Sequence, residues 1–149
     1  MKLQDFDFRI WDNHNKKYID NISYSIKKYQ NENKVFLPFS IDLSEYGNNE
    51  TFKDEIQIPS NRVEIELWTG FYDKNGKKIY EGDILYYFKD CSEGEVFKYQ
   101  VLFKEGAFYL FESYDGFVDD EDLIAEFDLK ELQVMGNIHE NKELLNVRL

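Results

Sequence analysis

A single cysteine, two histidines and a surplus of carboxylates are the side chains of this sequence that could do chemistry. Cys91 with His14 or His139 would form the simplest nucleophile pair, because a histidine that takes the thiol proton generates the reactive thiolate. Cys91 is surrounded by acids, a serine and one lysine, which is typical of an exposed loop and supports a thiolate poorly. One cysteine and two histidines are also too few ligands for a zinc site. We therefore predict neither a catalytic cysteine nor a Cys/His metal centre.

The pair of carboxylates at Glu81 and Asp83 is the second candidate. These two acids flank Gly82 and could form a binding or acid/base site. The structural interpretation, which we favour, is a tight bend in which Asp83 accepts hydrogen bonds from nearby backbone N–H groups. The sequence contains no Gly-rich phosphate loop, no Gly-x-Ser-x-Gly elbow and no His-Glu-x-x-His motif. We predict no catalytic residue beyond these two candidates and no cofactor.

Two acidic segments resemble the start of a calcium loop. In that loop, acids at positions 1, 3 and 5 precede a glycine at position 6. Counted from Asp73, Gly76 falls at position 4 and Lys77 at position 5, so the pattern fails. A second candidate begins at Asp120 and Asp122 but continues into apolar residues. We therefore predict no metal site.

A strongly acidic stretch runs from Glu112 to Glu131 and contains a single basic residue, Lys130. At its centre are four consecutive acids, Asp119, Asp120, Glu121 and Asp122. One interpretation is a solvated face that keeps the protein in solution. The functional interpretation is a binding face for another protein with a basic surface, because complementary charge steers association and selects partners.

The overall charge excludes several classes of function. Eighteen basic residues stand against 30 acidic ones in 149 residues, giving a net charge of −12. Such a chain repels nucleic-acid phosphate and anionic membranes, so direct nucleic-acid binding and membrane binding are not expected. No apolar run approaches the roughly 20 residues of a membrane span. The chain starts with acidic residues and no apolar signal region, so we expect a cytoplasmic protein.

Aromatic content and alternating patterns predict a mainly β fold. Aromatic residues make up 17% of the chain and favour strands. Apolar and polar residues alternate within 21–27, 35–41, 63–68 and 97–103, which indicates strands with one wet face. Asn75-Gly76 and Glu105-Gly106 predict hairpin turns. The run 84–88 is apolar on both faces and is therefore expected at the centre of a sheet.

Other segments are less regular. Pro38 lies inside the strand pattern 35–41, so that segment is expected to be an edge strand or a bulge. The acids at 119–122 precede Leu123 and Ile124 and predict one short helix; Asn141 is a candidate cap for a final turn. The fold class we predict is β with minor α: a small twisted, partly open β-barrel or two packed antiparallel sheets, with an N-terminal β unit and one or two short helices.

Four segments of the chain resemble the YopX-like proteins of bacteriophages and prophages. They occur in the family's order and are Phe8–Asp12, Trp68–Ile84, Gly106–Phe108 and Val134–Asn141. The sequence departs from the family pattern at His139, where the family usually has tyrosine, at Lys142, where proline is common, and at Phe71-Tyr72, which replaces Leu-Lys.

The resemblance implies a largely β product of a phage or prophage gene and implies no activity. We expect one YopX-like domain over 1–149, with a subdivision into an N-terminal β unit (1–41), a connecting acidic segment (42–62) and a main β-barrel (63–149). The expected partner is a basic host or phage protein in the bacterial cytoplasm, and self-association stays open. The alternative is a carboxylate-site hydrolase or nucleotide-handling enzyme.

Overall fold

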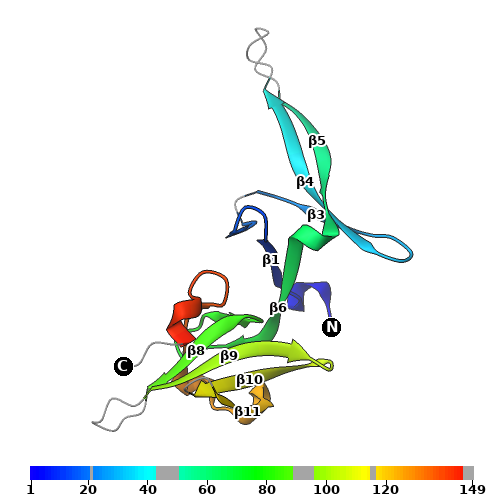
Figure 1. Cartoon of the computed structure of the whole chain (residues 1–149). Helices are drawn as coiled ribbons and strands as arrows, with labels where there is room; N and C mark the ends of the chain where they lie inside the picture. Colours follow the sequence, from blue (N-terminus) through cyan, green and yellow to red (C-terminus); the bar gives the residue numbers. More distant parts are fainter. Residues whose placement is uncertain (21, 43–50, 89–95, 115–116, 146–149) are drawn as a thin grey trace. The chain divides into compact units, whose positions relative to one another are not determined.

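The protein is mainly β, as predicted. The computed structural model describes residues 1–20, 22–42, 51–88, 96–114 and 117–145, in which strands alternate with turns and short 3-10 helices (Figure 1). The strands are β1 (Phe8–Asp12), β2 (Lys17–Tyr18), β3 (Ser25–Lys28), β4 (Asn33–Asp42), β5 (Thr51–Ile58), β6 (Val63–Tyr72), β7 (Lys78–Tyr80), β8 (Asp83–Phe88), β9 (Val96–Lys104), β10 (Ala107–Tyr114), β11 (Phe117–Leu123) and β12 (Leu132–Asn137). The 3-10 helices are η1 (Leu3–Asp5), η3 (Ser60–Arg62), η4 (Ile124–Glu126), η5 (Leu129–Glu131) and η6 (Lys142–Leu145).

The strands form three antiparallel sheets, with the hydrogen-bonded orders β2-β1-β6-β7, β11-β10-β9-β8-β12 and β3-β4-β5. The chain divides into two compact units. The main unit comprises Met1–Phe8 and Glu66–Leu149, and the inserted unit comprises Arg9–Ile65. Each unit has its own packing and is described separately.

The inserted unit contains the three-stranded sheet β3-β4-β5. Strand β4 is its central strand, which differs from the expected edge strand. Pro38 nevertheless pairs with Glu55 of β5 beyond the end of β3, whose last partner on β4 is Phe36. The proline therefore sits where β4 has one described neighbour and a missing N–H donor costs least.

The segment 42–62, expected as an acidic connection, contains regular structure. Strand β5 pairs residue by residue with β4, and η3 follows it; residues 43–50 lie outside the described part of the chain. The local sequence does not predict this strand, because Asp54 interrupts the apolar row that Phe52, Ile56 and Ile58 would otherwise form. The hydrogen bonds with β4 therefore define β5 as a strand, which its own sequence pattern does not.

An ion pair between a buried carboxylate and a partly exposed arginine joins the two ends of the inserted unit. Asp12 is 2% exposed, and its two carboxylate oxygens accept hydrogen bonds from Nε and Nη2 of Arg62, each at 2.9 Å. The backbone N–H of His14 donates to the same carboxylate at 2.9 Å. The Arg62 guanidinium, assisted by these N–H donors, holds the pKa of Asp12 well below its usual range despite burial. The charged form of Asp12 therefore stabilises the fold.

We predict that Asp12→Asn lowers the free energy of unfolding at pH 7 by about 3 kcal/mol, because it leaves Arg62 without its charged partner. Since the folded-state pKa is lowered, the contribution of Asp12 is fully present above its unfolded pKa near 4 and is lost as the pH falls further. Urea unfolding between pH 7 and pH 3 should show wild type and variant converging toward acid. A constant difference across that range would contradict the assignment.

The five-stranded sheet of the main unit curls into a half-barrel and holds the core (Figure 1). The core is made of apolar side chains from this sheet, from β7 and from the 3-10 helices η4 and η5, which lie between β11 and β12: Ile79, Leu85, Val101, Leu110, Ile124, Leu129, Leu132 and Val134. The apolar run 84–88 lies in β8, which has β9 on one side and β12 on the other, as its pattern predicts. Ile84, Leu85 and Tyr86 are buried accordingly.

Both predicted hairpins are present, with different turns. Lys104 pairs with Ala107, so Glu105 (φ 51°) and Gly106 (φ 79°) form a two-residue loop in which both residues have positive φ. In the β6–β7 loop only Gly76 (φ 77°) has positive φ, and its N–H donates to the carbonyl of Asp73 at 3.0 Å. Asn75 was expected to share that conformation and does not.

The helix predicted at the acids 119–122 is wrong. These residues belong to strand β11, where Asp122 pairs with Leu110 of β10, and helical geometry begins only at Ile124 as the short η4. A row of acids is locally compatible with the start of a helix, but pairing with the edge of β10 gives these residues hydrogen-bond partners in a strand. The final turn η6 is present, and Asn141 contributes its backbone carbonyl to it, accepting from the N–H of Leu144 at 2.9 Å.

Candidate functional site

The carboxylate of Asp73 connects the β6–β7 hairpin to β12. Asp73 is 6% exposed, and its Oδ1 accepts the N–H groups of Asn75 and Lys77, each at 2.8 Å. Its Oδ2 accepts the N–H of Val134 at 2.9 Å. Burial alone would raise the pKa of Asp73, but these three hydrogen bonds outweigh it and lower the pKa. The charged carboxylate of Asp73 therefore holds the β6–β7 loop and β12 together.

The bend at Gly82 lies between β7 and β8. Gly82 has φ 85°, its N–H donates to the carbonyl of Val101, and its carbonyl accepts the N–H of Ile138, both at 2.9 Å. A Cβ on Gly82 would lie 2.4 Å from Oε2 of Glu66. The backbone angle favours glycine at this position, and any side chain there would have to displace the end of the Glu66 side chain.

Glu66 and His139 form a largely buried pair beside this bend. Nε2 of His139 lies 3.2 Å from Oε2 of Glu66, and the two side chains are 15% and 6% exposed. A carboxylate that contacts an imidazole nitrogen fixes the orientation of the ring. Within the described residues, no group of three His, Cys, Asp or Glu side chains is placed to hold a metal ion. The pair connects the loop that carries His139 to β6.

The loop 136–141 presents His139 to Glu66. Oδ1 of Asn137 accepts the N–H groups of His139 at 3.0 Å and Glu140 at 2.9 Å. Oδ1 of Asn141 accepts the N–H of Asn137 at 3.2 Å, and a Cβ on Gly136 would lie 2.4 Å from that same oxygen. Two asparagines and one glycine therefore set the loop's path, which is a physical reason for the Gly-Asn-x-x-x-Asn spacing.

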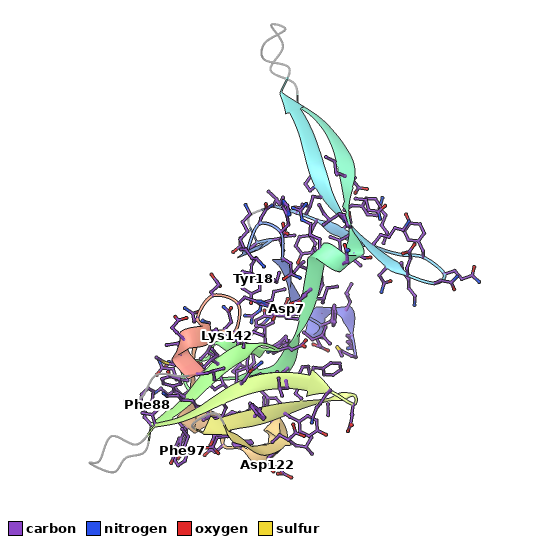
Figure 2. The ribbon with its side chains drawn as sticks, in the orientation of Figure 1. Asp7, Tyr18, Phe88, Phe97, Asp122 and Lys142 are labelled. Carbon is purple, nitrogen blue, oxygen red and sulfur yellow. The ribbon has the colours of Figure 1, made fainter. Side chains whose placement is uncertain are left out.

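Asp7 brings the N-terminal segment to the same hairpin. Its Oδ2 accepts a hydrogen bond from the hydroxyl of Tyr80 at 2.5 Å and forms an ion pair with Nζ of Lys78 at 2.9 Å. The carbonyl of Asp7 accepts the N–H of Trp68 at 3.0 Å, and Nζ of Lys78 lies 4.5 Å from the Trp68 ring centroid. Burial tends to raise the pKa of Asp7, but Tyr80, Lys78 and the Phe8 N–H outweigh it and lower the pKa. Figure 2 labels Asp7.

Glu81 and Asp83, the two catalytic candidates from the sequence, flank Gly82 in the bend between β7 and β8. Asp83 is 1% exposed, and its Oδ2 accepts the N–H of Tyr80 at 2.8 Å, as expected for a turn aspartate. Glu81 is partly buried, and its N–H donates to the carbonyl of Leu67 at 2.9 Å. A catalytic or binding role for Glu81 and Asp83 stays a prediction, and the observed contacts of Asp83 are structural.

The other predicted site residues are spread over the chain. The four acids Asp119–Asp122 lie on β11, at one end of the five-stranded sheet. Glu121 forms an exposed ion pair with Lys104. Cys91 lies outside the described residues, and His139 contacts Glu66.

Sequence reasoning missed the Glu66–His139 pair. The alternation over 63–68 places Val63, Ile65 and Leu67 in one row and implies that Glu66 faces solvent. In β6 the burial is reversed, because Glu66 is 4% exposed and Ile65 is 41% exposed. The available signal was Gly82, since a glycine in a tight bend permits the close approach of another group.

These contacts define a class of mainly β protein in which separate short motifs are joined by buried polar side chains. The chain belongs to the YopX protein family, whose sequence profile matches residues 7–146. Protein EF1440 from Enterococcus faecalis has a similar crystal structure, with a TM-score of 0.56 and 25% sequence identity over 94% of this chain and 97% of that chain. No curated protein matches the chain. The described residues contain no helix long and apolar enough to cross a membrane.

We predict that Gly82→Ala destabilises the protein more than Gly70→Ala. Both glycines have positive φ (85° and 87°), so both variants carry the backbone cost of about 1–2 kcal/mol. At Gly82 the new methyl group also collides with Glu66, whereas at Gly70 nothing lies within 4 Å, so we expect an added cost of about 1–3 kcal/mol. The urea concentration at the midpoint of unfolding measures the loss of stability in each variant.

The double variant Gly82→Ala/Glu66→Ala provides the check. Removing the carboxylate should recover the part of the loss that comes from the collision and leave the backbone cost. Equal effects of the two glycine substitutions would show that the Glu66 carboxylate does not press on the bend.

Proposed function

We propose that the protein is a phage- or prophage-encoded binding protein that acts by contact between proteins, through the acidic strand β11. The observation that carries this proposal is the placement of four consecutive acids, Asp119–Asp122, on a strand at the end of its sheet. The proposed partner is a host or phage protein with a basic surface.

The position of β11 supports this role. In the described part of the chain, β11 has one hydrogen-bonded neighbour, β10, so the other side of its ladder is available to a partner strand. Negative charge on an edge strand opposes pairing between identical copies, since like charges repel. The same charge favours a basic partner.

The charge of the whole chain acts in the same direction. A net charge of −12 raises the rate at which a basic partner arrives and makes association sensitive to salt. Lys104 partly neutralises the patch through its exposed ion pair with Glu121. Exposed pairs of this kind contribute little stability, so a partner's lysine or arginine can replace Lys104 at small cost.

The alternative function, a carboxylate-site hydrolase or nucleotide-handling enzyme at Glu81 and Asp83, has no comparable support. Asp83 is 1% exposed and accepts a backbone N–H from Tyr80. A carboxylate held in this way is suited to fixing a turn. We therefore base the proposal on β11.

The test uses a quadruple variant that neutralises the acidic strand. Its substitutions are Asp119→Asn, Asp120→Asn, Glu121→Gln and Asp122→Asn. We expect affinity capture from nuclease-treated host lysate to recover a basic protein at low salt with wild type. The variant should lose at least about tenfold of that recovery, because each removed charge weakens steering and pairing.

A second quadruple variant removes the same number of charges from exposed acids elsewhere in the main unit. Its substitutions are Asp5→Asn, Glu105→Gln, Glu126→Gln and Glu131→Gln. This control should retain most of the capture. Equal loss in both variants would reduce the effect to net charge, and unchanged capture by a folded β11 variant would refute the acidic strand as the binding face.

A further inference from the structure

The core face of the half-barrel is fully buried at its middle and becomes partly exposed toward both ends of the strands. Residues directly opposite in neighbouring antiparallel strands share a face, and side chains alternate along each strand. By register, Leu85, Val101 and Leu110 lie on this face, and all three are fully buried. In the direction of Phe88 and Val96, the same face carries partly exposed side chains: Tyr87, Phe97, Tyr99 and Glu112. We call these four residues the open end.

The aromatic rings of the open end are arranged in two pairs. Tyr87 and Phe97 are opposite each other in β8 and β9, with ring centroids 6.0 Å apart and planes inclined by 23°. Tyr99 contacts Phe127 edge-on, with centroids 5.3 Å apart and planes at 69°. Partly exposed ring faces attract cations, because the faces carry negative electrostatic potential.

The charges on this face are negative. Glu112 lies directly opposite Tyr99, and Asp122 of β11 lies on the same face, opposite Leu110. Burial, then Glu112, Tyr87 and Asp122, raise the pKa of Tyr99 to about 12, so its hydroxyl stays neutral near pH 7. Figure 2 labels Phe97 and Asp122, both at the lower side of the main unit.

The lysines of β9 belong to the opposite face. Alternation along the strand places Lys98 and Lys104 on the side away from Tyr99, where Lys98 pairs with Tyr86 and Lys104 lies over the ring of Tyr109. Both lysines of β9 therefore lie on the outer face, where Lys104 pairs with Glu121, whereas Glu112 and Asp122 lie on the core face. The negative charge beside Tyr99 is complementary to an occupant with positive charge.

We propose that the open end binds an arginine side chain from a basic segment of the partner protein, with Tyr99, Tyr87 and Phe97 as the stacking surface and Glu112 and Asp122 as the counter-charges. Arginine fits better than lysine, because its planar guanidinium stacks on aromatic faces and pairs with carboxylates through two hydrogen bonds. The inference rests on the proposed function and adds the side chain that is recognised.

The test is a calorimetric titration of the full chain with two glycine-spaced peptides of equal charge, one containing arginines and the other lysines. Wild type should bind the arginine peptide several-fold more tightly. Tyr99→Leu leaves the charge unchanged and keeps an apolar side chain, and it should weaken binding of the arginine peptide by about fivefold or more.

The matched control is Tyr109→Leu, which removes a tyrosine from the outer face of the same sheet and should leave binding unchanged. Should Tyr99→Leu fail to fold, Glu112→Gln keeps the side-chain size and should weaken arginine binding and reduce its salt dependence. Equal affinity for the two peptides, no binding by wild type, or no effect of these substitutions in folded protein would overturn the inference.

The two proposals fail separately. Peptide binding that is unaffected by Tyr99→Leu, together with lost capture in the β11 variant, would refute the arginine site and keep the acidic binding strand. Tight, Tyr99-dependent binding of the arginine peptide with unchanged capture in the β11 variant would refute the acidic strand as the partner-binding face.

Discussion

The main unit depends on the carboxylate of Asp73, which accepts three backbone N–H groups from two places in the chain. Two of these groups close the β6–β7 hairpin, and the third, the N–H of Val134, lies within β12, 61 residues later in the sequence. A neutral side chain of the same size could not accept all three bonds, since an amide offers one acceptor oxygen. The charge of Asp73 thus couples a local turn to the edge of the half-barrel.

The same logic recurs along the family motifs. Asp83 closes the bend before β8, Asn137 and Asn141 shape the loop after β12, and Asp7 holds Tyr80 and Lys78. Each is a short polar side chain that satisfies donors which strands alone would leave unpaired at their ends. The observed contacts of these motif residues are therefore structural.

The two surfaces proposed for binding are of a different kind. Strand β11 carries charge at the end of a sheet, and the open end carries aromatic rings where the core face loses its cover. Neither surface contains a short motif. Attraction to a basic segment requires only a negative electrostatic potential and aromatic surface close together, and many sequences can supply both. Their proximity on one sheet follows from the β10–β11 register. It places Asp122 of β11 opposite Leu110 of β10, and β10 in turn pairs with β9, which carries Tyr99.

The sequence by itself determined the mainly β class, the two hairpins, the central place of the run 84–88 and the turn role of Asp83, because turn chemistry and alternation act over a few residues. Strand β5 and the strand state of residues 119–122 were decided by pairing with β4 and β10, which a local pattern does not contain. The burial of Glu66 against His139 was also decided by tertiary structure. From sequence alone a glutamate is expected at the surface. Glu66 is buried because the fold places the imidazole of His139, 73 positions later in the sequence, beside its carboxylate.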